Sequence, residues 1–277
     1  MENKELAALA YDLRAKTIDV IMNARAGHIG GDMSVMDILV MLYFKHMNIS
    51  PLNCECADRD RFVMSKGHSV ESYYTVLSEK GFFSYEEYRN TFSRYGSKFI
   101  GHPSNKLPGV EMNSGSLGHG LPVSIGMALA GKMDRAAYRV YTVMGDGELA
   151  EGSVWEGAMA AGHFKLDNLC AVIDRNGLQI SGTTEDVMGH EPLAERFCAF
   201  GWNVIEAKGN DMDSLDAAFA SAKNCKGKPS VIIAHTTKGC GSPVMANKAA
   251  WHHKVPSEDE YRQIKADLLT RKEELLQ

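Results

Sequence analysis

Apolar residues recur at intervals of threes and fours near the start of the chain, at Leu6, Leu9, Leu13 and Ile21. This spacing predicts an amphipathic helix over residues 5–24. Ser34 and Asp37 resemble a capping box, so we expect a second helix to begin there and to cover residues 35–47. A strand is expected at 61–65 and a helix at about 70–80. Residues 92–115 are rich in Gly, Pro, Ser and Asn, so we expect a long functional loop there.

From about residue 116 onwards the pattern changes to an alternation of helices and strands. Helices are predicted at about 116–132, 152–164, before residue 202 and at about 213–223. Strands are predicted at 138–144, 168–174, 202–207 and 229–236, with a loop at 175 to about 190. The strands are apolar throughout, which is typical of parallel strands covered on both faces. The predicted fold class is therefore α/β, a doubly wound parallel sheet with helices on both faces.

We expect residues 1–277 to form a single domain, with a helical segment at the N-terminus and a polar helix over 257–277. Ligands of doubly wound sheets bind beyond the carboxyl ends of the strands. The chemistry is therefore expected after Met144, after Asp174 and after Thr236.

Composition excludes several classes of function but does not identify one. The chain is 44% hydrophobic and 23% charged with a net charge of −5, and no cluster of Lys and Arg indicates nucleic-acid binding. No apolar stretch approaches the roughly 18 residues of a membrane span, and the charged N-terminus differs from a secretory signal. The six cysteines lack zinc-binding spacing, so we interpret them as reduced thiols of a cytoplasmic protein. Neither nucleic acid nor membrane is expected as a partner, and we expect an anionic ligand to be held by a metal or by backbone amides.

Polar residues follow two of the predicted strands at their carboxyl ends. Gly145-Asp146-Gly147 can turn sharply and offers a carboxylate, and the following helix directs its N-terminus toward a ligand. Asn176 offers an amide oxygen, and a free backbone carbonyl follows it. Oxygen ligands of this kind, completed by phosphate oxygens and water, suit Mg²⁺. A lone Gly-Asp-Gly is most often only a tight turn, but Gly-Asp-Gly after one strand with Asp174-x-Asn176 after the next resembles the thiamin diphosphate fingerprint.

Further motifs resemble one branch of the thiamin enzymes, the transketolases, over nearly the whole chain. They are Ala26–Gly31, Arg59–His68, Gly101–Pro103, Pro108–Glu111, Ser114–Gly118, Gly145–Glu148, Glu151-Gly152, Trp155-Glu156, Lys238–Gly241 and Trp251-His252. The sequence departs from the usual family pattern at Arg175, at Ser181, where Asp is common, and at His119, where Gln is common. We leave His253 as a neighbour of the site.

The resemblance implies roles for particular residues. The implied metal ligands, for Mg²⁺ or for Ca²⁺ or Mn²⁺, are the side chains of Asp146 and Asn176 and the carbonyl of Leu178. The implied cofactor contacts are the Gly147 N–H to the diphosphate, His68 nearby, Gly115 and Leu117 beside the aminopyrimidine, and Glu151 at a subunit contact that couples two cofactors. The implied catalytic residues are His28, His102 and His252, which would line the substrate channel. Imidazoles with a near-neutral pKa suit such proton transfers.

The resemblance also implies a partner. In the family, the glutamate that activates the aminopyrimidine and the arginines that grip a sugar phosphate lie on a second domain, and we find no pattern for such a domain here. We therefore expect a split enzyme, in which a separate C-terminal transketolase subunit carries the pyrimidine-binding domain and two copies of each chain form an α2β2 assembly. The implied reaction transfers a two-carbon glycolaldehyde unit from a ketose or ketose phosphate to an aldose or aldose phosphate.

Two alternatives share part of this pattern. The α subunit of a 2-oxoacid dehydrogenase also has the Gly-Asp-Gly and Asn signals, but it does not predict His28, His68, His102 and Trp251-His252 together. A non-catalytic module with the same fold could instead regulate a partner. The intact set of Asp146, Asn176 and His68 argues against that second alternative.

Overall fold

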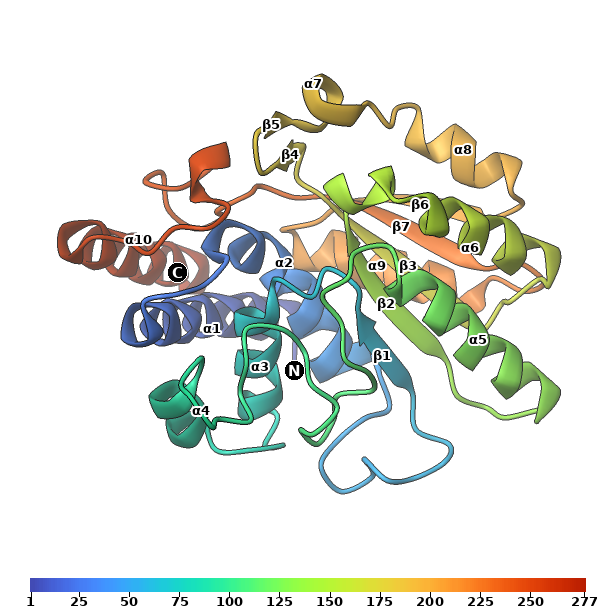
Figure 1. The fold of residues 1–277 in the computed structure, drawn as a ribbon, viewed down its shortest axis with the longest axis horizontal. Helices are drawn as coiled ribbons and strands as arrows, with labels where there is room; N and C mark the ends of the chain where they lie inside the picture. Colours follow the sequence, from blue (N-terminus) through green and yellow to red (C-terminus); the bar gives the residue numbers. More distant parts are fainter.

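The computed structural model describes all of residues 1–277. Its centre is a five-stranded sheet with the order β1-β2-β3-β7-β6 (Figure 1). All four pairings are parallel. The strands are β1 Arg61–Met64, β2 Val140–Gly145, β3 Leu169–Arg175, β6 Asn203–Lys208 and β7 Ser230–His235.

Two separate apolar layers cover the sheet, because alternate residues of each strand point to opposite faces. Cys170 and Val172 of β3 belong to one core, together with residues of α1, α2, α3 and α9. Ala171 and Ile173 belong to the other core, together with residues of α5, α6 and α8. The prediction of a doubly wound α/β sheet is therefore confirmed.

The helices follow the predicted alternation closely. On the first face they are α1 Asn3–Ala24, α2 Ile29–Met41, α3 Val70–Glu79, α4 Tyr85–Thr91 and α9 Met212–Asn224, and on the second α5 Gly120–Met133, α6 Gly152–His163 and α8 Leu193–Ala199. The last helix, α10 Glu258–Leu276, packs against α1, so the two ends of the chain lie side by side (Figure 1). The short elements are the π-helical turn Leu42–His46, the 3-10 turns Gly147–Ala150 and Ala249–Trp251, the hairpin of β4 Leu178–Gln179 and β5 Gly182–Thr183, and α7 Thr184–Met188. None of the helices combines the length and apolar character that crossing a membrane requires.

The predicted start of the second helix is wrong. Helix α2 begins at Ile29, and Ser34 lies inside it, fully buried. Its hydroxyl donates to Oδ2 of Asp174 at the end of β3, 2.7 Å away. Ser34 is thus a tertiary contact between α2 and the sheet, which local sequence spacing cannot distinguish from a cap. Helix α4 was not predicted from the sequence. Within the loop expected at 175–190, the β4–β5 hairpin and α7 were also not predicted.

Candidate active site

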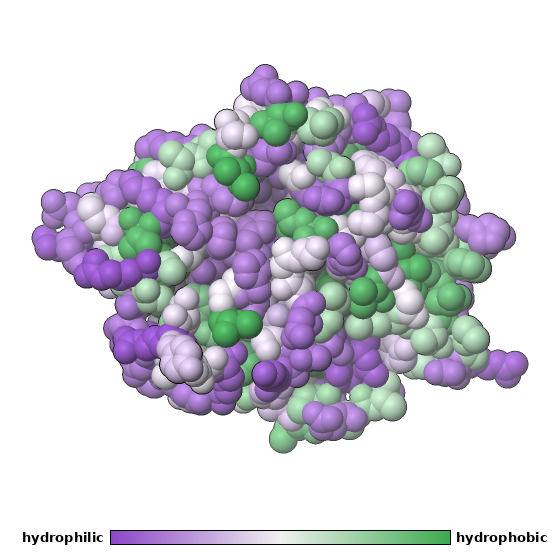
Figure 2. Space-filling model, viewed as in Figure 1, coloured by the Kyte–Doolittle hydropathy of each residue, from purple (hydrophilic) through white to green (hydrophobic).

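A cavity of about 460 Å³ opens at the carboxyl ends of β1, β2, β3 and β7. Its walls come from the segments that directly follow those four strands, together with the start of α2 and the loop before α5. The lining residues are His28, Gly31, Lys66, His68, Gly115, Leu117, Gly145, Asp146, Gly147, Glu148, Asn176, Leu178, Gln179, Ile180, Ser181, Lys238 and His252. Figure 2 shows mainly hydrophilic residues around a hollow near the middle of this face. Residues that follow Met144, Asp174 and Thr236 line this cavity, as the sequence predicted, and their chemical roles stay predictions.

All but two of the predicted site residues line this cavity, the exceptions being His102 and Glu151. His102 lies directly behind the wall: a Cβ added to Gly115 would come within 2.6 Å of its ring. Gly115 has a φ of 136°, so both its conformation and this contact require glycine. Glu151 is exposed at the start of α6. The roles assigned to these residues stay predictions.

Asp146 lies 2% exposed at the centre of the site. Its Oδ1 accepts the Gly147 N–H at 2.9 Å, and its Oδ2 accepts the Gly177 N–H at 2.6 Å and Nη1 of Arg175 at 3.2 Å. Burial, followed by the nearby Asp174, raises the pKa of the Asp146 carboxyl in spite of these donors. A cation beside Asp146 would stabilise its charged form.

The donor set of the site fits a hard divalent cation. Asp146 supplies a carboxylate, Asn176 an amide oxygen that accepts only the Leu178 N–H at 3.1 Å, and Leu178 a carbonyl. No group of three His, Cys, Asp or Glu residues is placed to hold a metal by itself. Three oxygens of mixed type match Mg²⁺, Ca²⁺ or Mn²⁺ only if a ligand such as a diphosphate completes the coordination.

Asp174, although part of the same motif, has its carboxylate engaged by other side chains of the protein. It is fully buried and accepts hydrogen bonds from Ser34, Lys66 and Thr236. Its charge is therefore neutralised by Lys66, and it anchors the end of β3.

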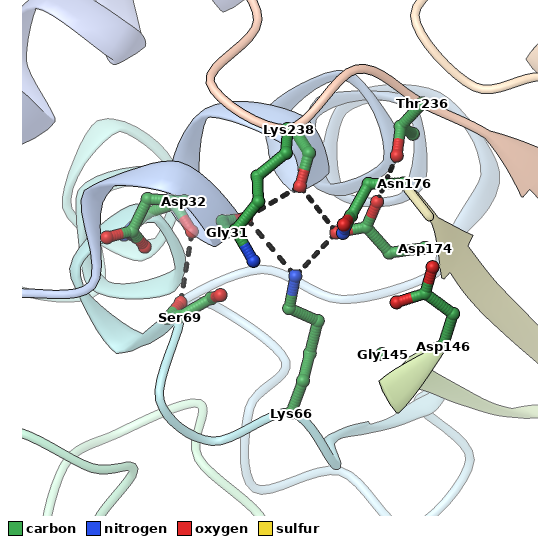
Figure 3. Close-up of polar contacts among 12 residues, drawn as sticks. Gly31, Asp32, Lys66, Ser69, Gly145, Asp146, Asp174, Asn176, Thr236 and Lys238 are labelled. Atoms are coloured by element: carbon green, nitrogen blue, oxygen red, sulfur yellow. Dashed lines mark hydrogen bonds and ion pairs between the residues drawn. The ribbon is translucent and has the colours of Figure 1, made fainter. Parts of the chain in front are cut away.

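Two lysines that were not predicted as site residues also line the cavity. Lys66 pairs with Asp174 and donates to the Gly31 carbonyl at 3.2 Å. Lys238 donates to the Leu178 carbonyl at 3.3 Å and to Nδ1 of His252 at 3.0 Å. Figure 3 shows the two side chains extending toward each other beside Asp174 and Asn176.

The expectation that a metal or backbone amides would hold an anion stays a prediction, and Lys66 and Lys238 are further cationic groups at the cavity. Net charge averages over the whole chain, whereas these two ammonium groups converge at one cavity. Both lysines stand inside motifs that carried the resemblance, and this was the signal that could have found them. Burial, and then Lys66, lowers the pKa of Lys238 to about 8.

Five histidines form a cluster centred on His28, next to Lys238. The ring centroids lie 5.4 Å from His28 for His68, 5.7 Å for His252, 6.3 Å for His102 and 4.6 Å for His253. Nδ1 of His28 is buried without a partner in the chain. This grouping draws together residues more than 200 positions apart in the sequence.

The pKa values of the imidazoles of His28, His68, His102 and His252 are not near neutral as expected, but lower. Burial lowers the pKa of His28 to about 4, and burial followed by Lys238 lowers that of His252 to about 3. Burial followed by Lys66 lowers the pKa of His68 well below its usual value, and burial lowers that of His102. All four rings are therefore neutral at pH 7, which leaves each with one donor and one acceptor nitrogen for hydroxyl groups.

Glu148 is a further lining residue. It is buried, and its carboxylate accepts the N–H groups of Gly118 at 2.8 Å and Gly145 at 3.0 Å as well as the hydroxyl of Ser65. These contacts tie the loops after β1 and β2 to the loop before α5. Gln179, also missed, faces Gly147, and its buried Oε1 has no partner in the chain.

This cavity belongs to a known class of cofactor-binding domain. Residues 6–274 match the family described as "Transketolase, thiamine diphosphate binding domain", and the chain belongs to that family. The resemblance that the motifs indicated is thereby confirmed.

Two similar curated proteins are themselves named as subunits. The first is one of the subunits of apulose-4-phosphate transketolase from Phocaeicola vulgatus, 48% identical over 262 residues, with 95% of this chain and 93% of that protein covered. The second is the 6-deoxy-6-sulfo-D-fructose transketolase subunit SqwG of a Clostridium species, 39% identical over 265 residues, with 95% of this chain and 96% of that protein covered.

Solved transketolases share the fold but are longer. The structure from Campylobacter jejuni superposes with a TM-score of 0.92 at 29% identity, and the match covers 99% of this chain and 46% of that one. The structure from Leishmania mexicana gives a TM-score of 0.88 at 28% identity, with 100% and 45% covered. The chain thus spans less than half the length of these two transketolases.

Proposed function

We propose that this chain is the diphosphate-binding subunit of a two-subunit transketolase, which transfers a two-carbon glycolaldehyde unit from a ketose to an aldose. The observation that carries the proposal is the composition of the cavity. Oxygen donors, lysines and histidines line one cavity, and all of them lie at the strand ends of a transketolase-family domain.

In the proposed holoenzyme, Asp146, Asn176 and the Leu178 carbonyl hold Mg²⁺, or Ca²⁺ or Mn²⁺, and the metal binds the diphosphate. The Gly147 N–H and Lys238 supply further positive charge to that group, whereas Lys66 is already paired with Asp174. His68 would lie beside it, and Gly115 and Leu117 would border the aminopyrimidine. Thiamin diphosphate, when bound, supplies the carbon nucleophile with which carbon–carbon bonds are broken and remade.

The chain's own contribution to the reaction is orientation and proton transfer. His28, His102 and His252 are neutral, so each can hydrogen-bond a sugar hydroxyl, accept its proton, and later return that proton from the protonated ring. The Lys238 ammonium donates to Nδ1 of His252, which leaves Nε2 of that ring protonated and able to donate. The burial that lowers these pKa values also favours exclusion of water from the reacting atoms.

We further propose a separate partner subunit that carries the pyrimidine-binding domain, in an α2β2 assembly located in the cytoplasm. The naming of the two relatives as subunits supports a partner of this kind. Glu151 would then lie at the contact between two copies of this chain, because it is exposed beside the cavity wall at Gly118.

The proposed donor is a ketose that carries an anionic group at the end distant from its carbonyl. The two relatives are named for apulose-4-phosphate and for 6-deoxy-6-sulfo-D-fructose, one a phosphate ester and the other a sulfonate. The higher identity to the first favours a phosphorylated ketose as the donor to test first.

The test combines this chain with a candidate second subunit, Mg²⁺ and thiamin diphosphate. Two-carbon transfer is measured with a ketose phosphate, the same ketose without phosphate, and a sulfonated ketose. We expect transfer with an anionic donor only. Decarboxylation of a 2-oxoacid without ketose transfer would favour the 2-oxoacid dehydrogenase alternative, and a complex that binds the cofactor without either activity would favour a regulatory module.

A further inference from the structure

Two acidic side chains are neighbours in the interior behind the histidines, within hydrogen-bond reach of each other. Asp32 lies in the first turn of α2 and Glu71 in the first turn of α3, and they are 0% and 1% exposed. Oδ2 of Asp32 and Oε2 of Glu71 are both buried without a hydrogen-bond donor. Asp32 extends away from the Lys66–Asp174 ion pair (Figure 3), and neither Asp32 nor Glu71 forms an ion pair of its own.

Two buried carboxylates in contact cannot both be ionised, because each charge disfavours the other in a medium of low dielectric constant. Burial, followed by the charge of Asp32, raises the pKa of Glu71 well above its usual value. Burial raises the pKa of Asp32 to about 6, although hydrogen bonds from Ser72 and from Glu71 oppose the shift. A single proton held between the two groups would provide the missing partner for both orphan oxygens.

The pair lies between the two helix starts that follow His28 and His68. Helix α2 begins directly after His28, and α3 begins just beyond His68. Oδ1 of Asp32 accepts the Ser72 N–H at 2.8 Å, so a residue of α2 caps the first turn of α3. The residue that precedes α3, Ser69, makes no such cap, and its hydroxyl has no partner.

Glu71 supports the other histidine. A Cβ at Gly27 would lie 2.9 Å from Oε1 of Glu71, so this carboxyl packs against the backbone that leads into His28. Asp32 and Glu71 therefore join the two helix starts that present His28 and His68 to each other, with ring centroids 5.4 Å apart.

We propose that Asp32 and Glu71 share one proton and act as a positioning pair, which holds the His28 and His68 turns together at the wall of the substrate cavity. The positioning role of the pair is inferred from these contacts alone. The consequence for catalysis rests on the proposed function.

The surroundings of the pair determine how it responds to pH. The charged and titratable groups that face it are Lys66 after β1 and Tyr74 and Tyr88 of α3 and α4, while His28 meets Glu71 through its backbone N–H. Lys66 is already paired with Asp174, and the Tyr88 hydroxyl donates to the Glu71 backbone carbonyl at 2.9 Å. Because the folded-state pKa values are raised, the folded protein loses stability relative to the unfolded chain as pH rises from the unfolded-state values of Asp and Glu.

The first test measures the proton on the isolated full-length chain. Glu71→Gln and Asp32→Asn each keep a donor between the helices and remove the shared proton. Infrared difference spectra at pH 7 should show a protonated carboxyl band in the wild type that Glu71→Gln lacks. The melting temperature of each variant should also decline less between pH 5 and pH 8. Glu79→Gln, an exposed carboxyl on the same helix, is the matched control and should change neither property.

The second test measures positioning. Glu71→Ala should shift the NMR signals of His28 and His68 and lower kcat/KM for the donor by up to about 10²-fold with the partner present, whereas Glu71→Gln should restore both. Absence of the infrared band, or unchanged histidine signals in Glu71→Ala, would overturn the proposal. Failure of Glu71→Gln to fold would overturn it as well, because the amide can donate as the acid does. A chain that shows the band and the signal shifts but no ketose transfer would refute only the proposed function.

Discussion

The guanidinium of Arg175 lies 3.2 Å from Oδ2 of Asp146, the carboxylate proposed to bind the metal. Arg175 also pairs with Glu191 at 2.7 Å and donates to Thr184 at 3.2 Å. It therefore joins the loop that carries Asp146 to the segment after the β4–β5 hairpin. The same oxygen of Asp146 therefore has two competing cations, one fixed in the chain and one to be recruited from solution.

This competition predicts that Arg175→Gln strengthens metal binding. Removal of about 1 kcal/mol of charge repulsion near the surface corresponds to a roughly three- to tenfold lower Kd for Mg²⁺. Calorimetric titration of Mg²⁺ at fixed thiamin diphosphate measures it. Arg196→Gln, on α8, serves as the control. A weaker affinity in Arg175→Gln would show instead that the arginine acts mainly by ordering the loop.

Asp146→Ala should abolish metal-dependent binding of thiamin diphosphate. The substitution removes the only carboxylate of the donor set and leaves the Gly147 and Gly177 N–H groups without their acceptor. Each unsatisfied buried donor costs about 1–3 kcal/mol, so a lower melting temperature accompanies the loss. Circular dichroism checks that the chain remains folded, and Asp186→Ala, at an exposed position, is the comparison. Unchanged affinity for the cofactor in calorimetry would refute the metal assignment.

Much of the fold could be predicted because the signals are local. Apolar strands such as 168–174, separated by helical stretches, are enough to indicate a parallel sheet with its ligand at the carboxyl ends. Ser34 could not be interpreted correctly, because the partner of its hydroxyl, Asp174, is 140 positions away. Spacing within one segment contains no information about such a contact.

The site residues likewise include some that local sequence could predict and some that it could not. Asp146 and Asn176 stand in motifs, and the family resemblance supplied their roles. Lys66 and Lys238 were missed because the net charge of −5 hides a local concentration of positive charge. The Asp32–Glu71 contact links residues of two different helices, and only the folded structure brings them together.

The lowered histidine pKa values predict a loss of stability in acid. The folded-state pKa of His28 is about 4, below its unfolded value, so the unfolded chain binds more protons as pH falls below about 6.5. Stability is therefore lost between about pH 6.5 and 4. His28→Gln should recover on the order of 1 kcal/mol at pH 5, discounted for the partial exposure of the ring. Urea unfolding at pH 7 and pH 5 measures it, with exposed His163→Gln as the control; an identical pH dependence in His28→Gln would contradict the assignment.

His102→Ala should separate cofactor binding from turnover. The ring lies behind Gly115, outside the group of metal ligands and lysines, so the affinity for thiamin diphosphate should stay nearly unchanged. Loss of one placed proton-transfer group typically costs about 10²–10⁴ in rate. Steady-state kinetics of the complete complex, beside a cofactor titration, measures both. If cofactor binding collapses while the surviving sites turn over normally, His102 belongs to the cofactor contacts.

Residues 1–277 alone should be catalytically silent, because no glutamate among them is free to activate the aminopyrimidine. Glu148 is the one glutamate that lines the cavity, and both of its oxygens already accept hydrogen bonds, from Gly118, Ser65 and Gly145. Glu151 is exposed outside the lining, and Glu71 is buried against Asp32. Withdrawing Glu148 from its donors would leave two backbone N–H groups unsatisfied, at a cost of about 1–3 kcal/mol each, so it cannot serve without breaking the wall of its own site. Purified chain with Mg²⁺ and thiamin diphosphate should therefore show no two-carbon transfer until a second subunit supplies the missing carboxyl. Full turnover by this polypeptide, with no second protein detectable by mass spectrometry, would refute the partner requirement, and loss of that turnover in Glu148→Gln would identify the group that replaces it.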